Sequence, residues 1–385
     1  MESRSYLNAG IKKRIIMIGS LPPPYHGSNV YFHNLLNSEL KDNFDISHLD
    51  ISDHRNLDNL SKLDLTNVYL ALKNLIMLFV LIKKIKPELI YIPIASNFLP
   101  YLRDGLFILL SSYFSKAGIV IHLHEGNFFR KVFYYESGYF NKKFIEYSLS
   151  KVNTAIVYTE ALKSNFEGFV KNIVAFPNGL KTETITDRNI IKQRSSENIQ
   201  INFMGNFFES KGVLEIIKAA AIVTEKRKDV TFNLAGTWLK NEEKTRLKAE
   251  DLIKENQLGS VVKFRGILTG KEKNKFMEET DIFLFPTWYP YEGCPMVILD
   301  VMSFGKPVIS TKDTGAIPEM VIDGETGILT EPKNVEQIAK AILKLIDNIE
   351  LMIQMGKTGR ERFEKLFTME INTENIINTF KKVIK

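Results

Sequence analysis

Residues 201–225 read INFMGNFFESKGVLEIIKAAAIVTE, and this stretch decides the fold. Ile201–Met204 is a short apolar run typical of a buried strand, a glycine-containing turn follows, and Gly212–Glu225 has the apolar spacing of a helix. The same alternation of strand and helix recurs along most of the chain. Strands that alternate with helices form parallel sheets covered on both faces, so the sequence predicts the α/β class.

The remaining predicted elements follow this pattern. The other strands are expected at Arg14–Ile18, Leu89–Pro93, Ile119–His122, Ala155–Tyr158, Asn172–Phe176, Thr231–Ala235, Val261–Arg265, Ile282–Phe285 and Pro307–Ser310. Helices are expected at Val30–Leu40, Leu60–Lys86, Glu242–Asn256 and Pro295–Phe304.

The length of 385 residues exceeds what one hydrophobic core ordinarily supports and predicts two domains. The polar stretch 178–200 lacks a sustained apolar period, and a fresh strand follows it. We therefore expect an N-terminal domain over 1–180, a linker over 181–200 and a second domain over 201–367. A helix over 368–385 either packs on the second domain or returns to the first.

Composition excludes several classes of protein. With 44% hydrophobic and 25% charged residues, the chain is neither largely disordered nor collagen-like. The net charge of +6 lies mostly in residues 1–180, which hold 20 basic and 15 acidic residues. This excess is too small and dispersed for a dedicated nucleic-acid binder, but it suits an anionic lipid surface or a phosphorylated substrate.

One cysteine, Cys294, excludes an internal disulfide and favours a reducing compartment, so we expect a cytoplasmic protein. The first residues lack the features of a secretory signal. The longest apolar stretch, Val68–Ile82, is interrupted by Lys73 and Asn74 and predicts a buried helix.

Two loops in the first half follow predicted strands and carry candidate site residues. After the first strand, Gly27 and Asn29 open a helix whose free N–H groups suit a phosphate, although a plain strand-to-helix turn explains the loop equally well. His122 ends the strand GIVIH and His124 follows it; we expect the two imidazoles to face opposite ways, so that at most one faces a ligand, the alternative being a purely structural pair.

Two further loops in the second half carry charged residues. Lys211 directly precedes a predicted helix, so it either contributes to a second anion site or is a solvated loop lysine. Glu292 lies on the loop after the strand ending at Phe285, and Asp300 lies within the apolar helix MVILDVM. An acid on such a face is costly unless it is paired or ligated, so Asp300 is a candidate to bind a diol such as ribose.

The pair Glu292 and Asp300, followed by FGKPVIST, TGAIPE and DGETGILTEP, resembles the family 4 retaining glycosyltransferases, which have the GT-B fold. GSLPPPYHGSNVYF, HLHEGNFF, VYTEALKSNF, FPNG and GNFFESKG extend the resemblance over nearly the whole chain. It implies two Rossmann-like domains whose parallel sheets face a central cleft.

The resemblance also implies residue roles. Lys211 would bind the donor diphosphate, Glu292 the hydroxyls of the donor sugar and Asp300 the ribose, while His124 would lie near the reacting carbon. The donor-binding set implied in full is Gly27, Asn29, Asn206, Lys211, Glu292, Gly293, Cys294, Met296, Val297 and Asp300. Anomeric configuration would be retained by front-side attack, with no protein nucleophile.

Three positions depart from the family's pattern. Asn206 stands where a basic residue is frequent, Asp300 replaces Glu, and Cys294-Pro295 replaces a common Phe-Gly. They leave open which UDP- or GDP-sugar is the donor. The chain has no Asp-x-Asp pattern, so we expect neither a metal nor another cofactor.

The acceptor is expected to be a saccharide, lipid-linked as in surface-polysaccharide assembly, and to meet the basic first domain. The interleaved basic and aromatic residues there predict peripheral docking on an anionic membrane; the alternative is ordinary solvated lysines and core aromatics. These residues are Lys12, Lys13, Arg14, Lys83, Lys84, Lys86, Phe128, Phe129, Arg130, Lys131, Phe133, Tyr134, Tyr135, Lys142 and Lys143. The rival function is a non-catalytic sugar-nucleotide-binding or scaffold protein of the same fold.

Overall fold

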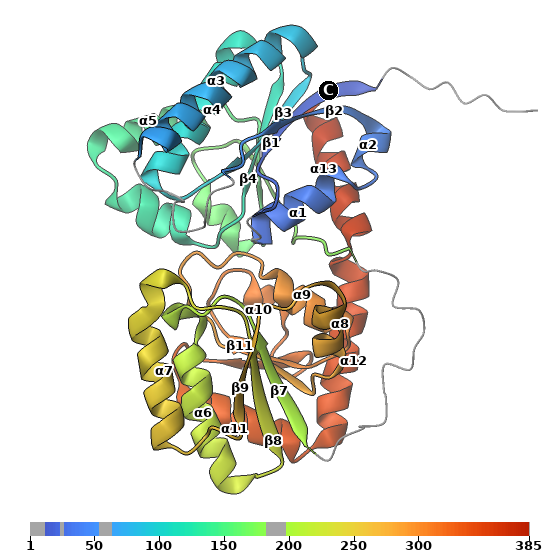
Figure 1. Ribbon diagram of the computed structural model, residues 1–385. Helices are drawn as coiled ribbons and strands as arrows, with labels where there is room; N and C mark the ends of the chain where they lie inside the picture. Colours follow the sequence, from blue (N-terminus) through green and yellow to red (C-terminus); the bar gives the residue numbers. More distant parts are fainter. Residues whose placement is uncertain (1–11, 24–26, 54–63, 182–197, 385) are drawn as a thin grey trace, which may run out of the picture. The chain divides into compact units, whose positions relative to one another are not determined.

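The computed structural model describes residues 12–23, 27–53, 64–181 and 198–384, and the chain forms two compact units. Unit 1 comprises Met1–His124, Phe129–Phe176 and Met369–Lys385, and unit 2 comprises Glu125–Phe128 and Pro177–Thr368. Each unit holds one 6-stranded parallel sheet with helices packed against it (Figure 1). The predicted α/β class is confirmed, whereas most of the predicted linker lies outside the described residues.

The sheet of unit 1 has the order β2-β1-β3-β4-β5-β6. Its strands are β1 (Lys13–Gly19), β2 (Phe44–Asp50), β3 (Leu89–Ile94), β4 (Gly118–Leu123), β5 (Thr154–Val157) and β6 (Asn172–Ala175). Because β1 pairs with β2 on one side and β3 on the other, the order of the strands reverses there. Ligands of open α/β sheets bind beyond the carboxyl ends of the strands at such a point.

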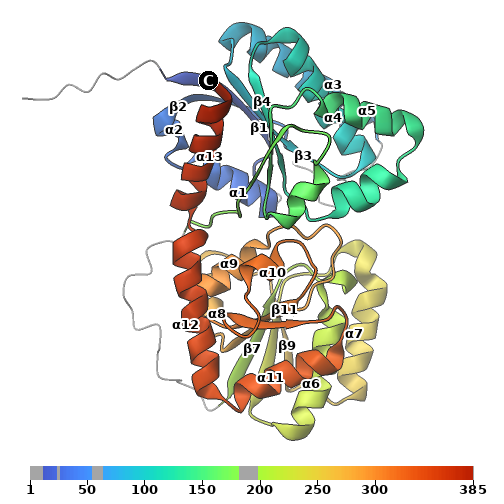
Figure 2. The ribbon, with the colours of Figure 1, turned by 180° about the vertical axis from the view of Figure 1, so that it is seen from behind.

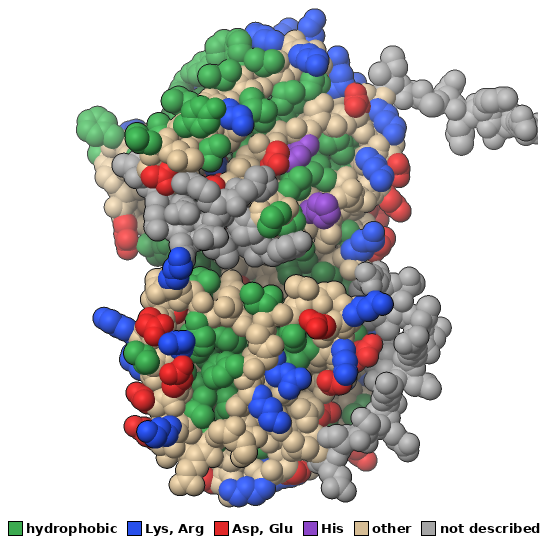
Figure 3. All heavy atoms as spheres, viewed as in Figure 1, with side chains coloured by type: hydrophobic (Ala, Val, Ile, Leu, Met, Phe, Trp, Pro, Cys, Tyr) green, Lys and Arg blue, Asp and Glu red, His purple; other side chains and the backbone are tan. Residues whose placement is uncertain are grey.

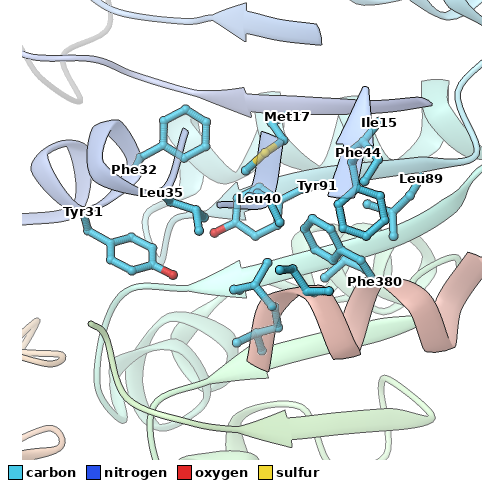
Figure 4. Close-up of a cluster of buried hydrophobic side chains, with 14 of the residues drawn as sticks. Ile15, Met17, Tyr31, Phe32, Leu35, Leu40, Phe44, Leu89, Tyr91 and Phe380 are labelled. Atoms are coloured by element: carbon cyan, nitrogen blue, oxygen red, sulfur yellow. The ribbon is translucent and has the colours of Figure 1, made fainter. Parts of the chain in front are cut away.

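The helices of unit 1 include one from the far end of the sequence. They are α1 (Gly27–Leu36), α2 (Leu40–Asn43), α3 (Leu65–Ile85), α4 (Phe98–Phe114), α5 (Tyr139–Leu149) and α13 (Met369–Ile384). Figure 2 shows α13 beside α1 and α2. Phe380 is fully buried against Phe44 and Tyr91, within the cluster of side chains that Figure 4 shows. The last helix is therefore part of the hydrophobic core of unit 1.

The sheet of unit 2 has the order β12-β11-β10-β7-β8-β9, which is the strand order of the Rossmann fold. Its strands are β7 (Ile199–Met204), β8 (Val230–Ala235), β9 (Val262–Gly266), β10 (Ile282–Phe285), β11 (Val308–Thr311) and β12 (Gly327–Thr330). The order reverses where β7 pairs with both β8 and β10. The loops that follow β7 and β10 thus flank the point at which this fold binds its ligands.

The helices of unit 2 pack in two groups. They are α6 (Val213–Lys226), α7 (Glu243–Glu255), α8 (Gly270–Glu278), α9 (Met296–Ser303), α10 (Ile317–Met320), α11 (Val335–Ile346) and α12 (Ile349–Leu366). α6 packs against α7 and α11, and α9 packs against α12. α9 begins at Met296, with Pro295 before it in an extended conformation, so the helix starts one residue later than predicted.

Two of the described strands, β2 and β12, were not predicted from the sequence, and each lies at the edge of its sheet. β2 carries Asp45, Ser47 and His48 and is only partly buried, and β12 has four residues. An edge strand lacks a neighbour on one side and needs no continuous apolar run, so its sequence gives a weaker signal.

The prediction of a buried helix over Val68–Ile82 is wrong. α3 buries Asn74, Leu78 and Ile82 on one face, but it exposes Tyr69, Leu72, Ile76 and other large apolar side chains on the opposite face. The largely apolar composition of the helix did not show which of its sides is covered by the rest of unit 1.

Candidate functional site

The loops after β7 and β10 touch closely in unit 2. Gly212 has a φ of 80°, and a Cβ atom there would lie 2.4 Å from the carbonyl oxygen of Pro286. The amide of Trp288 donates a hydrogen bond of 2.8 Å to the carbonyl oxygen of Ser210. Only glycine fits the turn before α6, because both the left-handed backbone and the close approach exclude a side chain. This packing brings Lys211 to the loop that carries Glu292.

Lys211 and Glu292, both predicted as site residues, form an ion pair. The Lys211 Nζ donates to Glu292 Oε2 at 2.5 Å, with side chains 14% and 9% exposed. Thr287 Oγ1 donates to the same oxygen at 3.0 Å. The Lys211 Nζ also lies 5.1 Å from the ring centre of Phe285 and 4.9 Å from that of Tyr289. The carboxylate is therefore held in one orientation, and the ammonium sits over two aromatic rings.

Tyr289 completes the walls around the ammonium. Burial, followed by the negative charge of Glu292, raises the pKa of its hydroxyl to about 12, so it remains a neutral hydrogen-bonding group at physiological pH. Neither Thr287 nor Tyr289 was predicted as a site residue. Both lie in the PTWYPYEG stretch between strand and acid, but nothing in their spacing separates them from the other polar and aromatic residues of that loop.

The backbone of Glu292 and Gly293 lies against the loop that follows β11. Gly315 has a φ of 53°, and a Cβ atom there would lie 2.3 Å from the Glu292 carbonyl oxygen and 2.4 Å from that of Gly293. The amide of Ala316 donates to the Gly293 carbonyl oxygen at 2.8 Å. Gly315 thus fixes the chain immediately after the acid.

Cys294 is buried and inert in this segment. Its sulfur lies 3.7 Å from that of Met320, and burial raises the pKa of its thiol to about 12. The thiol stays protonated and packs as a small apolar group. Met296 and Val297 are partly exposed in the first turn of α9, where amide groups lack partners within the helix.

Asp300 is paired, as its position on an apolar helix requires. Lys273, on α8, places its Nζ 2.6 Å from Asp300 Oδ2. Burial raises the pKa of Asp300, and the ammonium of Lys273 offsets part of this effect. The sequence pointed to the need for a partner, but Lys273 lies among several lysines in GKEKNK and could not be selected from them.

The remaining predicted residue of unit 2, Asn206, is partly buried in the loop after β7. Its carbonyl oxygen accepts a hydrogen bond of 3.0 Å from the amide of Phe208. The position lies on the same loop as Lys211, at the carboxyl end of a strand at the point where the sheet order reverses.

In unit 1, His122 within β4 and His124 directly after it lie in one aromatic cluster. The rings of His122 and His124 are 4.1 Å apart, so the expectation that they face opposite ways is wrong. The reason is that residues two apart in a strand share a face. His122 Nδ1 lies 2.7 Å from the Tyr91 hydroxyl, and His124 Nδ1 lies 2.6 Å from that of Tyr158.

The two histidines differ in their surroundings. His122 is fully buried, and desolvation followed by the charge of His124 lowers its pKa well below 6.5. Its Nε2 has no hydrogen-bond partner among the described residues. His124 is only partly buried, so it is the one of the pair that a ligand can reach.

The glycine loop of unit 1 is described in part. Residues 24–26 lie outside the described residues, while Gly27 begins α1 and Asn29 is buried in its first turn. A Cβ atom at Gly19, where β1 ends, would lie 2.5 Å from the ring of Phe32. The close approach of α1 to β1 places this helix start at the point where the order of the sheet reverses.

The segment directly after His124 groups with unit 2. A Cβ atom at Gly126 would lie 2.5 Å from the carbonyl oxygen of Glu292. The ring of Phe128 lies 4.1 Å from that of Tyr291. The HLHEGNFF motif is therefore shared between the two units, which its sequence did not indicate.

Comparisons with known proteins agree with this geometry. Residues 186–362 match the model of the family described as "Glycosyl transferases group 1". The capsular polysaccharide biosynthesis glycosyltransferase CapM of Staphylococcus aureus is 29% identical over 53% of this chain and 54% of its own length. An uncharacterized glycosyltransferase of Methanocaldococcus jannaschii is 30% identical over 59% of each chain. The matches thus span little more than half the length of these relatives.

Solved structures extend the likeness to both units. Sucrose-phosphate synthase of Thermosynechococcus elongatus superposes with a TM-score of 0.75 at 18% identity, covering 96% of this chain and 99% of that one. HepE of Anabaena, solved in complex with UDP, gives a TM-score of 0.70 at 18% identity, covering 96% of this chain and all of its own. Residues 186–362 therefore resemble the group 1 glycosyl transferases, and the chain has the two-domain α/β architecture of the GT-B fold.

Proposed function

We propose that the protein is a glycosyltransferase that moves a sugar from a nucleoside-diphosphate sugar to a hydroxyl of a saccharide acceptor. The observation that carries the proposal is the ion pair between Lys211 and Glu292, which lies where a Rossmann-ordered sheet binds ligands. This pair belongs to the region that matches the group 1 family.

The two residues have complementary tasks. A lysine ammonium carries three N–H donors, so Lys211 can hold Glu292 and still donate to oxygens of the departing diphosphate. The hydrogen bonds that Glu292 accepts from Lys211 and Thr287 both end at Oε2, so Oε1 can accept a bond from a sugar hydroxyl. The first amides of α9, from Met296 and Val297, favour negative charge in the same loop.

The proposed reaction retains the anomeric configuration. The acceptor oxygen forms a bond to the anomeric carbon as the bond from that carbon to the diphosphate breaks, and the diphosphate takes the proton of the acceptor. The protein supplies positioning and charge stabilisation rather than a nucleophile. Asp300 binds the ribose in this scheme, and Asn206, Gly293 and Cys294 complete the donor loops.

The residues of unit 1 keep the roles that the resemblance implies. Gly27 and Asn29 approach the phosphate, and His124 acts beside the reacting carbon. We propose that no metal takes part, so that transfer persists in EDTA; within the described residues no group of three or more His, Cys, Asp or Glu side chains could hold a metal ion.

The proposal also covers the acceptor and the cellular location of the protein. We propose a lipid-linked saccharide acceptor in surface-polysaccharide or glycan synthesis, and a cytoplasmic protein bound peripherally to a membrane. The similarity to CapM and to a poly(ribitol-phosphate) α-N-acetylglucosaminyltransferase of S. aureus, 26% identical over 69% of this chain and 50% of its own length, supports a role in cell-surface polymers.

A thermal-shift panel of UDP-, GDP- and ADP-sugars tests donor binding. A ligand at 100 times its dissociation constant stabilises the folded state by about 2.7 kcal/mol, so the donor that fits should raise the melting temperature by several degrees. The same donor should not shift Lys211→Ala. Binding without transfer or hydrolysis of any donor would favour a non-catalytic sugar-nucleotide-binding protein, and Glu292→Ala that turns over like the wild type would remove Glu292 from the site.

A further inference from the structure

The exposed side of α3 is apolar, which is unusual for a helix on a protein surface. Its large exposed side chains recur every three or four residues and so form one stripe: Leu65, Val68, Tyr69, Leu72, Ile76, Phe79 and Val80. Leu65 is 90% exposed, Leu72 56% and Ile76 65%. The opposite side, with Asn74, Leu78 and Ile82, is buried. A surface helix normally turns polar residues outward, so this helix carries a second apolar face.

The apolar surface continues onto the neighbouring helices. α3 packs on α4 and α4 on α5, and these helices expose Tyr113, Phe114, Tyr139, Phe140 and Tyr147. Figure 3 shows hydrophobic side chains gathered over the part of unit 1 where Figure 1 places these helices. We call the stripe of α3 and these five aromatic residues the apolar face. Scattered apolar side chains are normal on a soluble protein, but a contiguous face of this kind marks a binding surface.

The charges around this face are of one sign along α3. Residues 65–86 contain Lys73, Lys83, Lys84 and Lys86 and no acidic residue. Around α5 lie Lys142, Lys143 and Lys151, with Glu146 paired to Lys143. Lysines beside an apolar helix face are the pattern of helices that lie in the plane of a membrane containing anionic lipid.

The aromatic residues and lysines also contact one another. The Nζ of Lys83 lies 5.5 Å from the ring centre of Phe79 and 5.3 Å from that of Phe114, and the two rings are 5.0 Å apart. The Nζ of Lys151 lies 4.7 Å from the ring centre of Tyr147. Aromatic rings and long cationic side chains are the groups that settle at the boundary between hydrocarbon and head groups.

We infer that the apolar face of unit 1 docks on an anionic lipid bilayer, with α3 lying in the plane of the interface. α3 is long and apolar enough to cross a bilayer. Its buried face, however, packs into unit 1 and contacts β1 and β2, so the helix stays with its sheet. The inference rests on the membrane association included in the proposed function and names the surface that makes it; it does not depend on glycosyl transfer, because vesicle binding is measured without donor or acceptor.

Only some of the residues that the sequence predicted to dock on a membrane lie beside the apolar face. Phe129 and Phe133 are buried and cannot reach a membrane, so their predicted docking role is wrong. Their rings pack on each other and on Tyr101 inside unit 1. Lys83, Lys84, Lys142 and Lys143 remain part of the surface.

Vesicle co-sedimentation of the full chain tests the inference. The wild type should pellet with phosphatidylcholine–phosphatidylglycerol vesicles, bind much less to phosphatidylcholine alone and be released by added salt. Leu72→Gln/Ile76→Gln should weaken binding at least about tenfold, because two exposed apolar side chains no longer enter the bilayer. Lys83→Gln/Lys84→Gln should weaken only the anionic component, by about fivefold for each lysine.

Leu247→Gln/Ile267→Gln is the matched control. These two side chains are 49% and 68% exposed on unit 2, so the variant removes similar apolar groups from a different surface and should bind like the wild type. Circular dichroism and thermal melting verify that every variant folds. The inference is overturned if the wild type binds no vesicle, if the control loses as much as the α3 variant, or if ultracentrifugation shows a dimer that Leu72→Gln/Ile76→Gln dissolves while vesicles are not bound.

Discussion

The ammonium of Lys211 and the carboxylate of Glu292 lie 2.5 Å apart although 81 residues separate them in the sequence. Both side chains are largely buried, and each charge neutralises the other. Lys211→Met should leave the carboxylate with the hydrogen bond from Thr287 but without its counter-charge. We expect this variant to lose about 3 kcal/mol of unfolding free energy, since breaking a buried pair strands one charge. Urea unfolding measures the loss.

A double-variant cycle distinguishes this pair from two independent residues. Lys211→Met/Glu292→Gln should lose clearly less stability than the sum of the two single variants, because neither charge is left stranded. All three variants should lower transfer by at least about 100-fold if the pair acts on the donor. Additive losses of stability would show that the two side chains are not coupled.

Asp300 should affect nucleotide binding and pH dependence together. Its pKa is raised above 3.8 in the folded state, so the folded protein binds a proton more readily than the unfolded chain does. The stability from this group is complete below pH 3.8 and is lost as the pH rises through the raised value. Asp300→Asn should remove this decline from the pH dependence of the unfolding free energy.

The same variant should weaken nucleotide binding. The loss of a charged hydrogen-bond partner for the ribose is expected to cost about 1.5–3 kcal/mol, or roughly 10- to 100-fold in affinity. Asp251→Asn, at an exposed position on α7, is the matched control and should change neither property. Unchanged nucleotide affinity in Asp300→Asn would exclude Asp300 from the ribose site.

Gly315 should tolerate no side chain. Gly315→Ala places a Cβ atom against the carbonyl oxygens of Glu292 and Gly293 at a φ of 53°. We expect a loss of more than about 2 kcal/mol of unfolding free energy, because left-handed strain and the steric clash add. Gly259→Ala, where no heavy atom lies within 4 Å of the added Cβ, should cost well under half as much. Equal melting temperatures for the two variants would contradict the packing of the loop.

His122 should make unit 1 less stable at mildly acidic pH. Its pKa lies well below 6.5 in the folded protein, so below pH 6.5 the unfolded chain takes up a proton that the folded chain does not. The unfolding free energy should therefore fall as the pH drops below 6.5, by at most about 1.4 kcal/mol per pH unit from this group. His122→Gln should flatten that slope, and His33→Gln, at an exposed position, should keep it.

Strong local patterns were predictable from the sequence. The strands that carry the site, β7 and β10, and the turn before α6 have apolar runs and glycine signals that do not depend on distant residues. That Lys211 and Glu292 belong to one site could be anticipated only through resemblance, because strand order is set by packing of segments far apart in sequence. Their direct ion pair was not predicted.

Two other features, the partner of Asp300 and the exposure of α3, could not be predicted from local sequence patterns. Lys273 has many equivalent neighbours, so its contact with Asp300 appears only in three dimensions. The exposure of α3 was missed because apolar composition is the same for a helix that faces a core and for one that faces a lipid. The shared face of His122 and His124 follows from the two-residue period of a strand and was within reach of the sequence.

Release of nucleoside diphosphate from a nucleotide sugar tests the central claim most directly. The donor chosen by thermal shift is incubated with the full chain and a panel of saccharide acceptors, and free nucleoside diphosphate is measured over time for the wild type and Glu292→Gln. We predict release by the wild type that is accompanied by a glycosylated acceptor and reduced at least about 100-fold in the variant. No release with any donor, or equal release by the two proteins, would contradict the account.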